Sequence, residues 1–449
     1  MRQNRIDVIL RPVNKFIANE TAGGIVLFSA AVLAMIVANT PLHEFYHELW
    51  KYKFTIGFPP DFQISKSLHH WINDGLMSVF FFVVGLELKR EIIGGELSNA
   101  KKAALPLAAA AGGMIVPALI YFGFNAGTDS VSGWGIPMAT DIAFALGILY
   151  LLGKRVPLAL KVFLTALAIG DDIGAVLVIA FFYTSDISLF SLGLGSVFMA
   201  VLIGANLLGV RSPVFYGIVG IGGLWLAFLL SGVHATIAGV LAALTIPATV
   251  RIDARSFLTN LRKEADHFEH AEEGPKDLIS PDQLHAIDSI RKYTNAVDTP
   301  LQRLEHGMHP LVAFVVLPIF AFANAGITMT ADLFQQIASP VTLGVWFGLT
   351  FGKTIGIAIF SKLAVWLKIA ELPEGVTWRK IYAVSLLASI GFTMSIFITE
   401  LAFTNPDHIL QAKLGIFIAS GIGGVLGYLI LRMGSPLPAN GNGNGDGES

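Results

Sequence analysis

The sequence contains no cysteine and few charged residues. Without cysteine, the chain can form neither a disulfide framework nor a metal site built from thiolates. Charged residues make up 14% of the 449 residues and hydrophobic residues 54%, whereas soluble domains carry about 25% charged residues. One soluble core could not bury so much apolar surface, so the composition excludes an ordinary soluble protein.

Basic residues do not gather into a positive face, and the net charge is −2. The electrostatic footprint that a nucleic acid requires is therefore missing, and no such partner is expected. The first 20 residues are polar and basic without a cleavable signal pattern, and an apolar run follows them directly. This start is typical of a retained first helix that is preceded by a short cytoplasmic segment, residues 1–21.

Apolar stretches of about 20 residues recur along residues 22–433, and each is long enough to cross about 30 Å of hydrocarbon. We expect twelve spans, at residues 22–39, 75–88, 103–124, 134–153, 158–183, 188–209, 213–230, 233–249, 310–328, 340–366, 381–402 and 410–432. Ser231-Gly232 offers a turn between the seventh and the eighth. The predicted fold class is an all-α integral membrane protein.

Lysine and arginine collect in alternate short loops, which indicates the orientation of the spans. The N-terminus and the even-numbered loops are basic, whereas the third, fifth, seventh and ninth loops contain neither residue. The long first loop and the last loop, with Lys413, depart from this alternation. The pattern predicts that both termini are cytoplasmic. We expect the protein to be a multi-pass protein of the bacterial inner membrane.

The outer loop at residues 40–74 contains two short runs that flank Pro59-Pro-Asp61. This pattern predicts a β-hairpin on the outer surface. Because an isolated hairpin is marginally stable in water, we expect it to pack on a partner.

Two further segments are expected outside the bilayer. Residues 251–305 form a highly charged cytoplasmic insert, in which His267 and His270 have a metal-like spacing. A solvated helical face explains these histidines better, because the pattern dictates no further ligands. The composition of residues 434–449 predicts a disordered tail.

Four ionisable side chains lie deep within predicted spans: Asp141, Asp171, Asp172 and Lys353. A charge at the bilayer centre costs about 2.5–3.5 kcal/mol on insertion scales, so such residues usually face a cavity and mark an ion path. Asp171 and Asp172 project about 100° apart on a helix and can border one cavity with different contacts. Two such carboxylates cannot both stay ionised cheaply. A proton or a small hard cation must neutralise them, which is the chemistry of an exchanger; the alternative is a structural, hydrogen-bonded pair.

Asp141 and Thr140 lie where Pro137 and Gly147 weaken the fourth span. Interrupted helices are tolerated in membranes where the backbone lines a cavity, and each break leaves half-helix ends with partial charges. Asp141 can neutralise the positive ends, and Thr140 can add an oxygen ligand. A purely structural capping role for Asp141 is the alternative.

Lys353 lies too far from either predicted helix end to reach the interface easily, so a carboxylate partner is expected. Asp171 or Asp172 is the natural candidate, and a lysine that reaches the cytoplasmic interface is the alternative. The eleventh span carries a second interruption at residues 389–395. Spans three to five and ten to twelve start from opposite sides, and each trio has a broken middle helix. This arrangement predicts an inverted-topology repeat with its site at the midplane.

Several short motifs resemble those of the NhaA-type sodium–proton antiporters. They are Trp71-Ile-Asn-Asp-Gly-Leu-Met77, Val84-Gly-Leu-Glu-Leu-Lys-Arg-Glu91, Pro137-Met-Ala-Thr-Asp-Ile-Ala-Phe144, Ala168-Ile-Gly-Asp-Asp172, Ser231-Gly-Val-His-Ala-Thr236, Leu304-Glu-His with His309-Pro310, Phe320-Ala-Phe-Ala-Asn-Ala-Gly326, Gly352-Lys353 and Ser389-Ile-Gly-Phe-Thr-Met-Ser395. Any one motif is weak, but the ordered set spans residues 15–432 and is highly specific. The rule that inverted-repeat transporters bind their substrate at the membrane midplane was derived in part from NhaA-type antiporters. Agreement with that rule is therefore not independent support for the resemblance.

The resemblance implies a twelve-helix inverted repeat in which helices four and eleven are unwound and cross. It implies that Asp172 is the main carboxylate for Na⁺ and protons, and that Asp171 pairs with Lys353 when no ion is bound. Asp141 would neutralise the helix break beside Thr140. Family members are electrogenic secondary transporters, not enzymes, and they exchange cytoplasmic Na⁺ or Li⁺ for external H⁺ in sodium and pH homeostasis.

Activation at alkaline pH is also implied by the resemblance. The residues that carry this pH response in the family correspond here to Glu87, Glu91, Glu305 and His309. His234 matches a further family histidine linked to the pH response; the alternative is a packed residue at a helix end. The insert at 251–305 looks longer than in the simplest members. No cofactor is expected; the expected partners are membrane lipid and a second copy of the chain, bound through the outer hairpin, and no protein substrate is expected.

Three other functions compete with this interpretation. An intramembrane aspartyl protease uses a Gly-x-Gly-Asp signature, which Gly170-Asp171 matches only in part because Ala168 replaces the first glycine. A passive channel needs a continuous ring of ligands, usually from several subunits, whereas one off-axis pair with broken helices favours alternating access. A Na⁺-coupled symporter on a related fold stays open.

Overall fold

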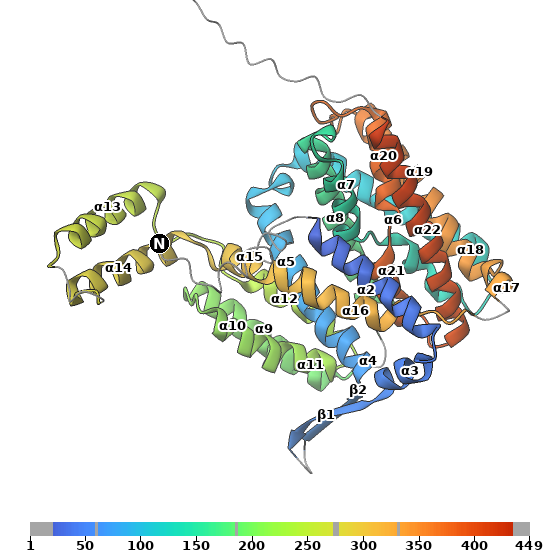
Figure 1. The fold of residues 1–449 in the computed structure, drawn as a ribbon, viewed down its shortest axis with the longest axis horizontal. Helices are drawn as coiled ribbons and strands as arrows, with labels where there is room; N and C mark the ends of the chain where they lie inside the picture. Colours follow the sequence, from blue (N-terminus) through green and yellow to red (C-terminus); the bar gives the residue numbers. More distant parts are fainter. Residues whose placement is uncertain (1–20, 59–61, 185–186, 273–277, 330–332, 434–449) are drawn as a thin grey trace, which may run out of the picture. The chain divides into compact units, whose positions relative to one another are not determined.

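The computed structural model describes residues 21–58, 62–184, 187–272, 278–329 and 333–433 (Figure 1). Most of the predicted N-terminal segment, the Pro-Pro-Asp turn and the predicted tail lie outside these residues. Among the described residues, the regular secondary structure is helical except for one two-stranded sheet. The described residues divide into two compact units, one within residues 1–80, 91–185 and 310–449 and the other within residues 81–90 and 186–309.

By length and composition, seven described helices can cross a membrane, and two bent pairs raise that number to nine. The protein is therefore an all-α, multi-pass integral membrane protein. The presence of twelve spans and of an inverted repeat is still a prediction from the sequence. The second predicted span, 75–88, is part of a longer run of helical turns from Leu68 to Gly94, through α4 (Leu68–His70), η1 (Trp71–Leu76) and α5 (Met77–Gly94).

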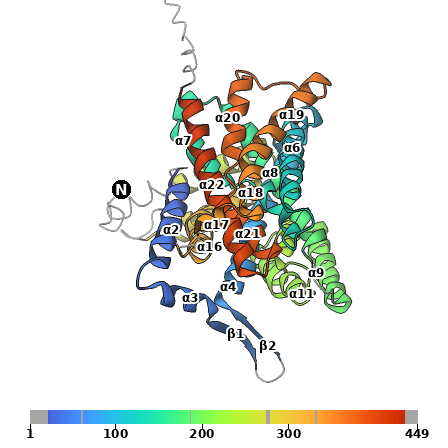
Figure 2. The ribbon, with the colours of Figure 1, turned by 90° about the vertical axis from the view of Figure 1, so that its right-hand side faces the viewer.

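Long helices form the body of the first unit (Figure 2). They are α2 (Ala22–Ala38), α6 (Ala100–Asn125), α8 (Leu158–Phe182), α18 (Pro340–Phe347) with η7 (Gly348–Lys353) and α19 (Thr354–Trp366), and α22 (Pro406–Arg432). Helix α6 packs against α8 and α19. Its approach to α19 is close, because a Cβ atom built on Gly112 would lie 2.2 Å from the backbone oxygen of Gly356. Small residues permit such backbone contact between membrane helices.

Two segments of this unit are interrupted near their middle. The first is η3 (Val131–Met138) followed by α7 (Ile142–Leu151), and the second is α20 (Trp378–Ala388) followed by α21 (Phe392–Ala402). Helices α20 and α21 bend by 46° at their break. The remaining elements are α3 (His43–Lys51), η2 (Glu96–Ser98), η4 (Gly153–Arg155), η6 (Val312–Val316), α16 (Leu317–Asn324) and α17 (Leu333–Ile337).

The hairpin of the first unit pairs β1 (Lys53–Phe58) with β2 (Phe62–Ser67) in antiparallel register, with Lys53 opposite Ser67. Figure 2 shows it extending away from α3 and α4. The indole of Trp71 donates to the Phe54 carbonyl at 3.0 Å and ties the hairpin to η1. Phe54 and Ile56 are about half exposed, so the sheet presents apolar side chains to its surroundings.

The second unit combines apolar helices with the charged insert. Its elements are α9 (Leu189–Leu207), α10 (Pro213–Val219), η5 (Gly220–Trp225), α11 (Leu226–Leu229), α12 (Ala235–Thr245), α13 (Ala254–His270), α14 (Pro281–Val297) and α15 (Pro300–Leu311), which continues into the first unit. Leu202, Leu224 and Ala243 are buried in its core. Helices α13 and α14 pack on each other, and His267 and His270 lie within 3.5 Å of acidic side chains of their own helix. Among the described residues, no three potential metal ligands form a group.

Candidate functional site

Asp171 and Asp172 lie near the middle of α8, a helix of 25 residues that is unbroken from Leu158 to Phe182. Apolar residues fill the positions on both sides of the pair. Both carboxylates are fully buried, with 0% exposure. Burial of an ionised carboxylate is costly unless a positive charge or hydrogen bonds compensate it, so the surroundings of the pair decide its chemistry.

The Asp171 carboxylate contacts two side chains from other elements. Lys353 Nζ lies 2.8 Å from Asp171 Oδ2, and the Thr140 hydroxyl lies 2.8 Å from the same oxygen. The second oxygen, Oδ1, has no hydrogen-bond partner among the described residues. One oxygen of Asp171 is thus strongly engaged, and the other can still accept a ligand.

Lys353 is fully buried at the end of η7, a π-helical turn between α18 and α19. Such turns are rare and occur frequently at functional sites. Its ammonium also donates to the Met138 carbonyl, at the C-terminal end of η3, where a helix carries partial negative charge. Asp172 interacts electrostatically with the same ammonium. Two buried carboxylates therefore share one positive charge, and a proton or a cation can supply the second.

Asp141 connects the two interrupted segments. It is the N-cap of α7, and its Oδ1 accepts from the Phe144 backbone N–H at 3.0 Å. Its Oδ2 accepts from the Thr393 backbone N–H at 3.1 Å and from the Thr393 hydroxyl at 2.5 Å. Thr393 lies in the first turn of α21. One carboxylate thus compensates the positive ends of two half-helices.

Further hydrogen bonds hold the two breaks together. The Asp141 N–H donates to the Ile390 carbonyl at 2.7 Å. The Thr140 hydroxyl lies 2.9 Å from the Ala388 carbonyl, in addition to its contact with Asp171. On the other side of the break, the Ser395 hydroxyl donates to the Ile136 carbonyl at 2.8 Å. Movement of either broken segment must therefore disturb the groups around Asp171.

The residues to which the family resemblance assigns the pH response are distributed over both units. Glu87, Glu305, His309 and His234 lie in the second unit and Glu91 in the first. In the second unit, Arg90 and the largely buried Glu305 form an ion pair, and His234 directly precedes α12. In the first unit, Glu91 accepts a hydrogen bond from the Glu96 backbone N–H at 2.9 Å.

Sequence reasoning assigned no role to a second charged cluster in the first unit. Lys413 Nζ lies 2.7 Å from Glu400 Oε1, and both side chains are about one-tenth exposed. His69 Nε2 lies 3.8 Å from Glu400 Oε2 and 2.9 Å from the Asn324 side-chain oxygen. The expected place of Lys413 in the last loop is wrong, because Lys413 lies inside α22. Glu400, inside α21, is a charge within an apolar run and could have been singled out. Thr393, by contrast, lies in the Ser389–Ser395 motif, but nothing in that motif singled it out from its neighbours.

Comparison with known proteins gives a consistent result over nearly the whole chain. A family model described as Na⁺/H⁺ antiporter 1 matches residues 14–431. The chain is 52% identical over 429 residues to the Na(+)/H(+) antiporter NhaA of Oleidesulfovibrio alaskensis, with 95% of each chain covered. It is 48% identical over 435 residues to the Na(+)/H(+) antiporter NhaA 1 of Saccharophagus degradans, which covers 96% of this chain and 93% of the relative. It is also 48% identical to the Na(+)/H(+) antiporter NhaA of Wolinella succinogenes, with coverage of 93% and 92%.

Proposed function

Because the chain belongs to the Na⁺/H⁺ antiporter 1 family, we propose that Asp171 and Asp172 form one site at which Na⁺ and H⁺ compete. The protein is a secondary transporter that exchanges Na⁺ for H⁺, and it is not an enzyme. The observation that carries the proposal is the pair of adjacent, fully buried carboxylates, of which Asp171 contacts the Lys353 ammonium at 2.8 Å. Carboxylate oxygens suit a small hard cation, which is here the transported substrate.

The roles of the two carboxylates differ in this proposal. Asp171 is engaged by Lys353 and Thr140 through one oxygen, so we assign it to the ion-free pair with Lys353. Asp172 is then the principal ligand of Na⁺ and the principal proton carrier. Asp141 and Thr140 support the site, since Asp141 compensates the half-helix ends and Thr140 adds an oxygen beside Asp171. No resident cofactor enters this scheme.

The exchange cycle follows from the competition. Facing outward, Asp171 and Asp172 take up protons; the broken segments then reorient, and cytoplasmic Na⁺ displaces the protons. Na⁺ leaves on the outer side when the site returns. If both carboxylates cycle, two protons enter for each Na⁺ that leaves, so the exchange is electrogenic and the membrane potential assists export. Li⁺ is a second substrate in this proposal, because it is also a small hard cation.

Orientation and regulation complete the proposal. We propose an inner-membrane location, and the basic even-numbered loops support the placement of both termini in the cytoplasm. We assign the response to alkaline pH to Glu87, Glu91, Glu305, His309 and His234. The Arg90–Glu305 ion pair supports an electrostatic role for Glu305, because loss of Arg90 removes an ion-pair partner of a largely buried charge.

Everted vesicles provide the test of the proposed exchange. After respiration acidifies their lumen, addition of Na⁺ or Li⁺ is expected to dequench a trapped pH-sensitive dye, because each cation taken up releases protons. Choline chloride at the same concentration controls for ionic strength. The absence of dequenching in vesicles that contain the inserted protein would contradict the proposal.

We also propose that the outer hairpin joins two copies of the chain. The half-exposed Phe54 and Ile56 on β1 support this, since they offer an apolar strand surface. Replacing both with Thr keeps β-propensity but removes apolar contact area. The expected result is a shift from dimer to monomer in mass photometry of the detergent-solubilised protein; a variant that stays dimeric would show that the interface lies elsewhere.

A further inference from the structure

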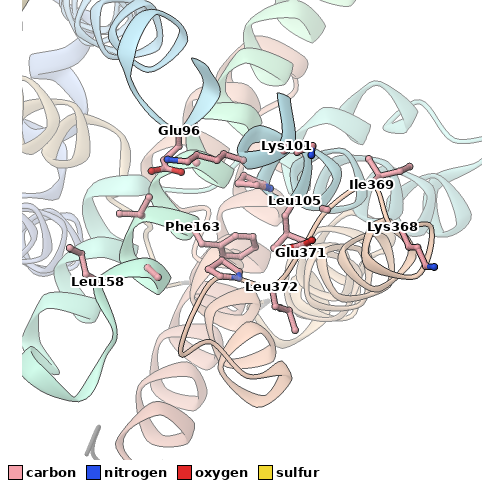
Figure 3. A pocket seen from close by; sticks show the side chains of 16 residues that line it. Glu96, Lys101, Leu105, Leu158, Phe163, Lys368, Ile369, Glu371 and Leu372 are labelled. Atoms are coloured by element: carbon pink, nitrogen blue, oxygen red, sulfur yellow. The ribbon is translucent and has the colours of Figure 1, made fainter. Parts of the chain in front are cut away.

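A cavity of about 690 Å³ opens in the first unit beside the starts of α6 and α8 and the connection from α19 to α20 (Figure 3). Small-molecule sites have volumes of about 300–1,000 Å³. Among the described residues that line the cavity, none belongs to the carboxylate site. The exchange mechanism therefore leaves this cavity without a function.

The inner part of the cavity is apolar and its rim is amphipathic. Leu105, Phe163 and Ala166 line it and are each only 2% exposed. At the rim, Leu158 is 76% exposed and Ile369 58% exposed. Exposed apolar side chains at the end of a membrane helix are suited to contact with lipid chains rather than with water. The cavity thus fits an amphipathic occupant.

Five charged side chains surround the same cavity. Three are lysines and two are glutamates: Lys101, Lys102, Lys368, Glu96 and Glu371. Figure 3 shows Glu96, Lys101 and Glu371 approaching it from different segments. In the described part of the chain, none of the five forms an ion pair with another side chain. Charges of both signs are therefore available to a ligand.

The N-terminal ends of two helices indicate where in the cavity a negatively charged group would bind. Helix α6 begins at Ala100 and α8 at Leu158, and both starts border the cavity. The N-terminal end of a helix carries partial positive charge and exposed backbone N–H groups, which favour phosphate. Lys101, Lys102 and the two helix starts together suit a phosphate, and the two glutamates suit an ammonium group. The Lys368 side chain points away from the other labelled charged groups (Figure 3).

We propose that this cavity binds the headgroup of a phospholipid with a primary amine, a phosphoethanolamine lipid. The phosphate binds Lys101 and Lys102 at the helix starts, and the ammonium binds Glu96 and Glu371. The acyl chains leave past Leu158 and Ile369. Basic pockets between membrane helices are known to hold lipid headgroups; the two glutamates that line this cavity distinguish it from a site for purely anionic lipid.

Native mass spectrometry of the delipidated full-length protein tests the proposal. The probes are phosphatidylethanolamine, phosphatidylcholine and phosphatidylglycerol with identical acyl chains. Phosphatidylethanolamine is expected to be retained best, and Lys101→Gln with Lys102→Gln to lower its retention about tenfold, as expected for the loss of charge-assisted contacts. A matched pair of exposed lysines in the insert, Lys263→Gln with Lys292→Gln, is expected to change nothing.

A second variant separates headgroup recognition from a folding defect. Glu371 lies exposed in the connection after α19, so Glu371→Gln is expected to fold and to exchange Na⁺ normally. It should lower the preference for phosphatidylethanolamine over phosphatidylcholine several-fold, because glutamine cannot balance the ammonium charge.

Three outcomes would overturn the proposal. One is equal retention of all three lipids by the unchanged protein. Another is retention of phosphatidylethanolamine by the Lys101, Lys102 variant at the level of the Lys263, Lys292 control. The last is full displacement of the lipid by equimolar soluble phosphoethanolamine, which would identify a small soluble ligand instead. Normal Na⁺/H⁺ exchange in the variants shows that a change in lipid retention is not a loss of fold.

Discussion

Replacing Asp172 with Asn is expected to lower Na⁺/H⁺ exchange by at least about two orders of magnitude, since the lost group acts only in the transport step. Asparagine has nearly the size of aspartate but carries no charge and no exchangeable acidic proton. The site would keep its packing in α8, where Asp172 is fully buried, but would lose its proposed Na⁺ ligand and proton carrier. Na⁺-induced dequenching in everted vesicles measures the effect.

The control for this variant is Asp266→Asn, which removes a carboxylate from the exposed face of α13. It is expected to exchange at the rate of the unchanged protein. Membrane levels of both variants need to match, so that a loss of signal reports transport and not insertion. Exchange by Asp172→Asn at the control rate would refute the assignment of Asp172 as the ion-binding carboxylate.

Replacing Lys353 with Met is expected to cost about 3–5 kcal/mol of stability, the usual penalty for leaving one member of a buried ion pair behind. The methionine fills a similar volume, so packing changes little. Asp171 would lose the ammonium at 2.8 Å, and the Met138 carbonyl would lose its donor. Thermal unfolding of the detergent-solubilised protein, compared between acidic and alkaline pH, measures the loss.

The double variant distinguishes charge from packing. Asp171→Asn combined with Lys353→Met removes the orphaned carboxylate, and it is expected to recover most of the lost stability. Acidification should also reduce the defect of Lys353→Met alone, because a protonated Asp171 needs no counter-charge. If the double variant is less stable than Lys353→Met at every pH, the ion pair does not explain the effect.

The long helices could largely be predicted from apolar runs in the sequence, but the residues at which they begin and end could not. The prediction for the second span began at residue 75, whereas helical turns begin at Leu68. His69 and Asn73 read as loop residues, but both contact Asn324. Polar groups inside a helical segment are tolerated when hydrogen bonds satisfy them, and such partners cannot be inferred from local hydropathy.

The candidate site was predictable as a set of residues but not as a set of contacts. Intramembrane charges singled out Asp141, Asp171, Asp172 and Lys353, and Pro137 indicated a break near Thr140. Gly147, the second expected breaker, lies inside α7. A Cβ atom built on Gly147 would lie in ordinary van der Waals contact with Gly24 of α2, at 3.7 Å from its Cα atom.

Contacts between distant segments were beyond the reach of a single sequence. The bond from Thr393 to Asp141 joins residues 252 positions apart, and the bond from Lys353 to the Met138 carbonyl joins residues 215 positions apart. Both depend on how the two interrupted segments meet. Neither helical periodicity nor charge placement contains that information.

Competition between Na⁺ and H⁺ for one carboxylate pair is the central claim, and the pH dependence of Na⁺ binding tests it most directly. Isothermal titration of Na⁺ into the purified protein gives an apparent Kd at each pH. At pH values below the pKa of the carboxylates, the Kd for Na⁺ should fall about tenfold for each unit rise in pH if one proton is displaced. If two protons are displaced, the Kd should fall up to about a hundredfold for each unit. A Kd that does not change with pH across the active range would contradict the account.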